Sequence, residues 1–254
     1  MNIENIYCDY LNAVNKIKQT ERNSESNVFH ASAAGSCYRK QLYSYYKFKT
    51  EEFDINNAND RKSLKILRLG TIVHKDMEEA LIKYQDENAN KEIYSEVKIE
   101  INSLNVVGTF DAGEMIKKGD LKHFNLYDLK TVAAYKWQKM FGLKKNREPN
   151  ADSNYKLQLG TYALGIKEKF KPDKINMFLV YYNKNTSIMK ERIVSHKWIN
   201  KALEYWSELN ELLEEFGKSF EDELEPEIYE GVPFENWECN YCQFSDICPS
   251  NLSK

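Results

Sequence analysis

The spacing of apolar residues changes abruptly near residue 90. Across 64–85 apolar side chains recur every three or four positions, which predicts a long helix with one buried face. Residues 94–101 instead alternate with a period of two, 102–103 favour a turn, and 104–110 run back as a partner strand. A long helix followed by a hairpin restricts the chain to folds in which helices pack on a sheet.

The remaining elements extend this pattern on both sides. Three more strands are predicted, at 123–129, 175–182 and 188–194. Four more helices are predicted, at 3–18, 36–48, 154–168 and 197–217, with loops at 19–27 and 51–61. The element order predicts an α/β fold, a mixed central sheet flanked by helices. We expect one integrated domain made of an N-terminal helical segment (1–63), a core (64–196) and a C-terminal segment (197–254).

Composition excludes several classes of protein. The 254 residues are 42% hydrophobic and 30% charged, with only 10 Gly and 5 Pro, so collagen-like and wholly disordered chains are excluded. No apolar run approaches the ~20 residues that a membrane span needs. The first residues lack the basic and apolar regions of a secretory signal. We therefore expect a soluble, cytoplasmic protein.

Charge is unevenly distributed along the chain. The net charge is −3, from 36 basic and 39 acidic residues. Residues 136–147 contain no acid, whereas 204–230 are strongly acidic. A basic segment beside an acidic flank favours a positive groove for nucleic acid, and solvated helix faces are the alternative. The basic candidates for DNA contact are Lys136, Lys139, Lys144, Lys145 and Arg147.

Two carboxylates and a lysine fall on neighbouring predicted strands. Asp111 is predicted to end the strand 104–110, and Asp128 lies near the end of 123–129. Residues two apart on a strand share a face, so Asp128 and Lys130 should project together. If the two strands pair, Asp111 approaches the same point. Such a hard-oxygen site suits Mg²⁺ or Mn²⁺, and Lys130 could offset negative charge during attack on phosphorus.

Two helices supply further polar candidates. His74 and Glu78 are spaced i, i+4 on the long helix, and Gly70 one turn earlier would allow a close approach to a neighbour. Gln158 and Tyr162 repeat this spacing on the next helix. Each piece has an ordinary alternative, because a strand-borne Asp-x-Lys is often a surface pair and a helix histidine is often a core residue.

Taken in order, these residues resemble the RecB-like branch of the PD-(D/E)xK nuclease superfamily. The match consists of His74, Gly108-Thr-Phe-Asp111, Asp128-Leu-Lys130 and Gln158-x-x-x-Tyr162. Many members of the family carry Glu where this chain has Asp128. The resemblance implies a restriction-endonuclease-like core and hydrolysis of DNA phosphodiester bonds.

The same resemblance implies roles for the individual residues. It makes His74, Asp111, Asp128 and the backbone carbonyl of Leu129 the metal ligands. Lys130 is then the catalytic lysine, and Gln158 and Tyr162 line the DNA path. We include Glu78 with these residues in the candidate catalytic set because it shares the helix face of His74.

The cysteines form an asymmetric pattern. Cys239, Cys242 and Cys248 form a compact trio followed by Pro249, and Cys37 is the best fourth ligand. A trio with one distant partner favours a cluster over the paired ligands usual for zinc, although zinc and free thiols are alternatives. The arrangement resembles the iron–sulfur nucleases of the same branch, namely AddB, the Dna-two helicase–nuclease and the fourth CRISPR-associated protein family. That resemblance implies a [4Fe–4S] cluster joining the two chain ends, with Cys8 left as a small buried hydrophobe.

These features lead to one expected function and two alternatives. We expect a metal-dependent deoxyribonuclease acting on single-stranded DNA or DNA ends, as an exonuclease, in recombination, repair or CRISPR adaptation. Tyr135 and Trp137 are expected to stack on bases. No GxxxxGK[ST] segment occurs, so a helicase would be a partner, alongside recombination or CRISPR-adaptation proteins. The alternatives are a non-catalytic DNA- or partner-binding subunit and a zinc-stapled DNA-binding module.

Overall fold

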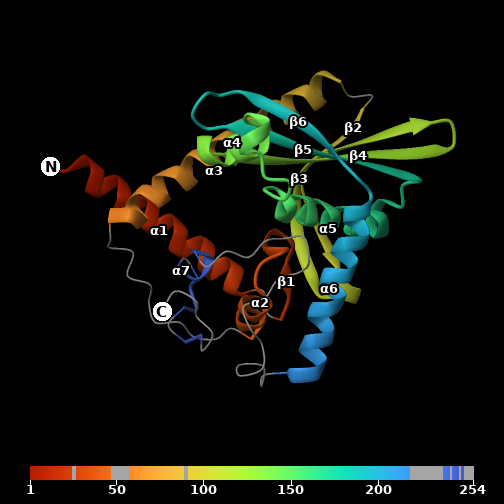
Figure 1. Cartoon of the computed structure of the whole chain (residues 1–254). Helices are drawn as coiled ribbons and strands as arrows, with labels where there is room; N and C mark the ends of the chain where they lie inside the picture. The colour runs from red at the N-terminus through yellow and green to blue at the C-terminus, as the bar shows by residue number, and fades with distance from the viewer. Residues whose placement is uncertain are drawn as a thin grey trace.

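A mixed sheet lies at the centre of the computed structural model, which describes residues 1–24, 27–46, 58–88, 91–217, 237–240, 242–245 and 247–248 (Figure 1). Within these ranges the sheet has six strands in the order β1-β3-β4-β5-β6, and β2 pairs with the other edge of β3. The strands are β1 (Phe29–His30), β2 (Glu92–Ile101), β3 (Val106–Lys118), β4 (Leu121–Val132), β5 (Lys174–Asn183) and β6 (Met189–Val194). β4 and β5 are parallel, whereas β2, β3 and β4 form an antiparallel meander. The predicted α/β fold with a mixed sheet is confirmed.

The described residues also form α-helices, some of which pack on this sheet. They are α1 (Ile3–Ser24), α2 (Tyr38–Tyr45), α3 (Ala58–Glu87), α4 (Ala134–Phe141), α5 (Ser153–Phe170), α6 (Lys197–Phe216) and the short α7 (Trp237–Asn240). α5 packs against β2, β3 and β5, and α6 packs on α5 (Figure 1). α3 contacts β2, β3 and β4. No described helix is long and apolar enough to span a membrane.

The main core lies between the sheet and the α5–α6 pair. β5 alternates buried and half-buried residues, so Ile175, Met177 and Leu179 point into the core, as a period-two strand requires. α6 buries its apolar face, including Tyr205 and Trp206. The two helices are in close contact because α5 has Gly160 at the crossing, where a Cβ atom would lie 2.1 Å from the carbonyl oxygen of Trp198.

Several predicted boundaries were wrong. Residues 19–24 and 58–61 are helical, because α1 and α3 continue through polar stretches that we predicted to be loops. Residues 25–26 and 51–57 of those stretches lie outside the described residues. β3 continues to Lys118 because it pairs with β4 through a turn at Gly119, which has a left-handed φ of 61°. Asp111 therefore lies within a strand and not at its end.

Candidate functional site

The predicted carboxylates lie where β3 changes its strand partner. β1 pairs with β3 at Val106 and Val107, whereas β4 pairs with β3 only from Ala112 onwards. Asp111 falls between these two ladders, and Asp128 follows the last β4 residue that pairs with β3, Tyr127. The site is therefore a fork at which β4 separates from β3, and both aspartates lie at its branch point.

Asp111 connects the fork to α3. One of its oxygens, Oδ2, accepts a hydrogen bond of 2.5 Å from the backbone N–H of Leu129. The other, Oδ1, lies 3.8 Å from Nδ1 of His74. The structure thus brings His74, Asp111 and the Leu129 backbone together, through the N–H of Leu129 and not through the carbonyl that the resemblance implies as a metal ligand.

Asp128 and Lys130 form the buried part of the site. Their side chains project together, and the Lys130 ammonium lies 2.8 Å from Oδ2 of Asp128, whose side chain is only 1% exposed. Lys130 also donates a hydrogen bond of 2.9 Å to Oε1 of Gln158, whose Nε2 donates one of 2.6 Å to the hydroxyl of Tyr162. Lys130 is therefore held from both sides.

Gln158 and Tyr162 differ from their expected position along a DNA path. Both side chains are buried, with Tyr162 only 3% exposed. The reason is that α5 turns this face toward the sheet, where Tyr162 packs beside Gly108. Both residues contact Lys130 or each other and orient it, so neither lies on an open surface in this structure.

Burial controls the protonation of this site. It raises the pKa of Asp111 and of Asp128 to about 6, an effect that the Lys130 charge opposes. Burial alone would lower the pKa of Lys130, but the two carboxylates outweigh it and raise that pKa. Burial, followed by the Lys130 charge, lowers the pKa of His74. At neutral pH the fork therefore combines a neutral imidazole, an ammonium and two carboxylates. Burial destabilises the charged carboxylates, so a further cation would stabilise them.

The donor atoms suit a divalent cation in kind. Oδ2 of Asp128 contacts the Lys130 ammonium but accepts no well-formed hydrogen bond from the described residues. A buried carboxylate oxygen with spare acceptor capacity beside a neutral imidazole is a donor set that Mg²⁺ or Mn²⁺ accepts. In the described part of the chain, however, no group of three or more His, Cys, Asp and Glu side chains has the spacing to hold a metal ion. Metal ligation would therefore require side-chain adjustment.

Two glycines allow the helices to approach the fork. A Cβ at Gly70 of α3 would lie 2.8 Å from Oγ1 of Thr131, next to Lys130 in β4. A Cβ at Gly108 would lie 2.7 Å from Cβ of Ala31 and 3.0 Å from the Tyr162 ring. The expected close approach at Gly70 is confirmed, and it brings the His74 helix onto β4.

Sequence analysis missed Glu96. This residue lies on β2 between the pairs Ser95–Ala112 and Val97–Phe110, directly across from Asp111. Its φ of 49° is unusual for a residue other than glycine. Burial first, then the charges of Glu78 and Asp128, raises the pKa of Glu96. The strand period alone could not single it out, because 94–101 contains a second exposed glutamate, Glu100.

The basic segment 136–147 is part helix and part turn. Its first part belongs to the amphipathic helix α4, which buries Trp137 (8% exposed) and Met140. The prediction that Trp137 stacks on bases was therefore wrong, whereas Tyr135 is 73% exposed. Lys139 pairs with Glu148 at 3.0 Å. Lys144, Lys145 and Arg147 are exposed on the turn after α4.

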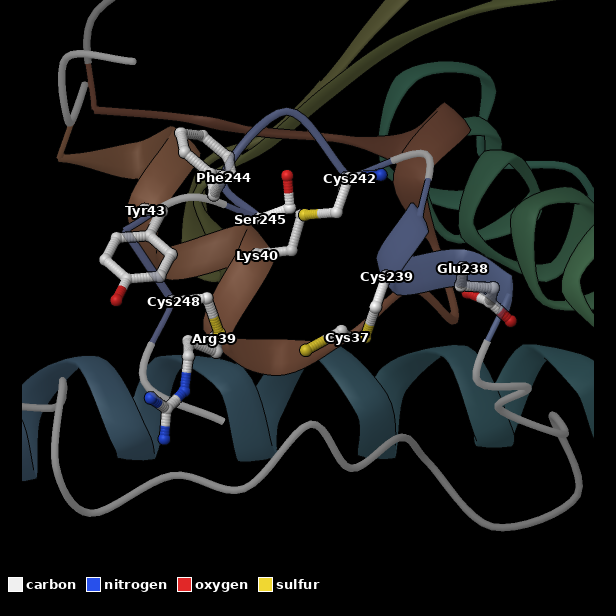
Figure 2. Close-up of a pocket in the computed structure, with 10 residues that line it drawn as sticks. All are labelled: Cys37, Arg39, Lys40, Tyr43, Glu238, Cys239, Cys242, Phe244, Ser245 and Cys248. Carbon is white, nitrogen blue, oxygen red and sulfur yellow. The ribbon is translucent and has the colours of Figure 1, made fainter. Parts of the chain in front are cut away.

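Four cysteines from the two ends of the chain line one pocket. Figure 2 shows Cys37 at the start of α2 facing Cys239, Cys242 and Cys248, with Arg39 and Lys40 beside them. Burial, opposed by hydrogen bonds from the backbone of Lys40 and Arg39, raises the pKa of Cys37 to about 11. Cys8 is buried elsewhere, in α1, as expected for a small hydrophobe. The thiols share a pocket, although their present spacing is not that of an assembled metal site.

A model of the PD-(D/E)XK nuclease superfamily matches residues 56–249, which include the whole fork and the C-terminal cysteines. The chain belongs to the PD-(D/E)XK nuclease superfamily. PD-(D/E)XK nucleases generally use divalent metals such as Mg²⁺, and DNA is the substrate that this membership implies. No curated protein matches the sequence.

Solved structures resemble this PD-(D/E)XK chain at low sequence identity. The crystal structure of SSO0001 is 20% identical, with 94% of this chain and 97% of that chain covered and a TM-score of 0.50. A candidate exonuclease from Eubacterium rectale is 14% identical (82% and 87% covered, TM-score 0.45). An alkaline exonuclease, LHK-Exo, from Laribacter hongkongensis is 12% identical (75% and 90% covered, TM-score 0.39). At such identities, the match to SSO0001 supports the fold alone.

Proposed function

We propose that this nuclease is a divalent-metal-dependent deoxyribonuclease that cleaves single-stranded DNA or DNA ends as an exonuclease. The observation that carries the proposal is the buried Asp128–Lys130 pair, 2.8 Å apart, at the same fork as Asp111 and His74. Burying charges costs free energy, so an ordinary structural role gives little reason to keep this set together.

The fork residues divide the chemistry between them. His74, Asp111, Asp128 and the Leu129 carbonyl would hold Mg²⁺ or Mn²⁺, which activates water and withdraws charge from phosphate when it is bound. Because its neighbours raise the pKa of Lys130, this side chain acts as an ammonium. It stabilises the negative charge that develops on the phosphate oxygens during in-line attack. Gln158 and Tyr162 fix the position of that ammonium.

Glu78 and Glu96 would complete the acidic rim. Glu78 lies one helical turn beyond His74, and its charge, like that of Asp128, raises the pKa of Glu96. Their charge would assist metal entry and repel DNA in the absence of metal. We assign them to the rim of the site because the aspartates occupy its centre.

The exposed basic residues would bind the DNA backbone. Lys144, Lys145 and Arg147 lie exposed on the turn after α4, and the half-buried Lys139 of α4 would join them by exchanging Glu148 for a phosphate. Tyr135 at the start of α4 is exposed and could stack on an unpaired base, as single-strand binding requires. This surface would guide a strand to the fork.

We also propose that Cys37, Cys239, Cys242 and Cys248 bind a [4Fe–4S] cluster. The observation that supports this is the shared pocket of four thiols, with the cationic side chains of Arg39 and Lys40 beside it. The cluster would join segments 1–63 and 197–254 across the core 64–196, making one integrated domain. Recombination, repair or CRISPR adaptation, with a helicase or another partner, is the proposed setting.

Digestion of labelled DNA tests the proposed activity. The parent should shorten linear end-labelled single strands with Mg²⁺ or Mn²⁺, spare circular single strands, and lose activity with EDTA. Lys130→Met should lower the rate about 100-fold or more, whereas Lys167→Met, on the exposed end of α5, should keep it. DNA binding without cleavage by the parent would contradict the proposal and favour the non-catalytic subunit. Cleavage of circles would replace the exonuclease by an endonuclease.

A further inference from the structure

Two lysine ammonium groups share one aromatic ring beside the fork. Tyr155 lies in the first turn of α5, three residues before Gln158. The Lys136 ammonium lies 3.8 Å from the centroid of its ring, and that of Lys130 lies 5.3 Å from the same centroid. The ring face attracts both cations and holds Lys136 of α4 next to the proposed catalytic lysine.

Among the residues that the structure describes, no carboxylate lies within ion-pair distance of the Lys136 ammonium. Asp152 and Glu238 act on it only at longer range. Asp152 is already occupied, because Lys156, Arg192 and the Tyr181 hydroxyl contact it at 2.5 to 2.8 Å. A partly buried cation beside two further cations, Lys130 and Lys139, is electrostatically unfavourable on its own. An anion from outside the chain would remove this cost.

We propose that Lys136, supported by Tyr155, forms a second phosphate site that holds a phosphodiester flanking the scissile one. This inference rests on the proposed nuclease function, whose substrate supplies that anion. The two ammonium groups are at most about 9 Å apart, since both distances are measured from one ring centroid. One DNA strand carries a phosphate about every 3.4 Å along the helix axis. A strand can therefore contact both lysines within a few nucleotides.

The proposed site differs from the rest of the basic segment. Lys144 and Lys145 are exposed and can bind phosphates in many positions, whereas Lys136 is half-buried and braced by a ring. A lysine whose ammonium is already held by an aromatic ring loses little side-chain entropy when it binds a phosphate. It can therefore favour one alignment of the DNA strand in the site. Lys136 would thus place a particular phosphodiester at Lys130. It is a positioning residue and not a catalytic one.

Neutral methylphosphonate linkages test this site. Single-stranded oligonucleotides carry one such linkage at successive positions around a defined cleavage point, and single-turnover rates are measured at saturating Mn²⁺. For the parent, neutralising one particular flanking linkage should slow cleavage about tenfold or more, the effect of removing one charge-assisted hydrogen bond. The Lys136→Gln variant should cleave the all-phosphate DNA slowly. Neutralising that one linkage should no longer slow its cleavage further, whereas the effects at all other linkages should match those of the parent.

Three further variants separate positioning from structural support. In Lys136→Arg, neutralising that linkage should again slow cleavage as it does in the parent. Lys145→Gln should show the same pattern of rates as the parent, because Lys145 is exposed. Tyr155→Leu removes the ring, so neutralising the same linkage should slow cleavage less than it does in the parent. This variant tests the site even if Lys136→Gln fails to fold. Full sensitivity at every linkage in both Lys136→Gln and Tyr155→Leu would overturn the site while leaving the nuclease proposal intact. A parent that cleaves none of these oligonucleotides would overturn the proposed function and the site with it.

Discussion

At the scale of single residues, the fork concentrates charges that a stable core would avoid. Asp128 is 1% exposed and Lys130 is 15% exposed, yet neither is replaced by an apolar residue. Removing charges from water costs several kcal/mol for each ion, and their mutual attraction offsets only part of that cost. The site therefore carries a pH-dependent penalty in the absence of metal.

The first prediction concerns this penalty, measured in EDTA. As pH rises from 4 to 7.5, the free energy of unfolding of the parent should fall relative to that of Asp128→Asn, which has no carboxyl to titrate at this position. The folded pKa of about 6 lies above the ordinary value of an aspartate, so the parent is favoured while the acid is protonated and loses stability as pH rises through about 6. The difference in unfolding free energy, variant minus parent, should rise by about 2 kcal/mol.

Urea unfolding at several pH values checks this. The exposed Asp86→Asn variant is the matched control and should parallel the parent. Parallel curves for Asp128→Asn would show that the carboxyl titrates normally in the folded protein.

At the scale of elements, α5 organises the site. Its buried face supplies Gln158 and Tyr162 to Lys130, and the helix also packs against β2, β3, β5 and α6. α4 then extends the surface beside it with the basic residues that follow β4. The spacing between α5 and α6 therefore affects both stability and catalysis.

The second prediction tests this spacing. Gly160→Ala should destabilise the protein by about 1 to 3 kcal/mol, because the added Cβ would lie 2.1 Å from the Trp198 carbonyl oxygen and one helix must move. Helix propensity alone would favour alanine. Thermal unfolding measures the loss, with Lys167→Ala on the exposed face of α5 as control. A stabilised Gly160→Ala protein would show that α6 can shift at no cost.

The third prediction concerns the exposed basic turn. Changing Lys144, Lys145 and Arg147 together to Ala should weaken single-strand binding across all sequences, because phosphate contacts carry no base information. The slope of log K against log salt should decrease by about 0.7 for each phosphate that the variant no longer neutralises. Fluorescence anisotropy over a salt series measures it, and the triple change of Lys83, Lys167 and Lys197 is the control. An unchanged slope would show that the side chains of this turn make no contact with DNA phosphates.

At the scale of the whole molecule, a segment before the core and a segment after it meet at one pocket. Cys37 precedes the core and Cys239, Cys242 and Cys248 follow it, so a group bound by all four closes a very long loop (Figure 2). Such a closure removes conformational freedom from the unfolded chain and couples binding to folding. Loss of one ligand should therefore affect regions far from the pocket.

The fourth prediction follows from this closure. We expect a single replacement by Ser to remove iron and acid-labile sulfide from protein purified anaerobically, and to lower the melting temperature. This holds for each of the four positions Cys37, Cys239, Cys242 and Cys248. Cys8→Ala should retain both, since Cys8 is buried in α1 away from the pocket. Zinc without sulfide would replace the cluster by a metal ion. Iron lost from Cys8→Ala but kept in Cys37→Ser would reassign the N-terminal ligand.

Much of the site could be predicted because its signals are local. The period of two placed Asp128 and Lys130 on one face of a strand, and the i, i+4 spacing placed Gln158 with Tyr162. Gly70 also indicated a close approach, which Thr131 provides. Backbone geometry repeats over a few residues, so such relations can be predicted from sequence.

Other features depend on contacts between distant segments. The chain alone did not show that Glu96 lies across from Asp111, that Tyr162 is buried beneath Lys130, or that α4 turns Trp137 inward. Strand register and helix docking decide these points, and both arise from the packing of many side chains at once. The sequence by itself therefore determined the α/β order and the chemical identity of the fork. Only the tertiary structure decided which charges face one another, because burial and distance are properties of the packed chain.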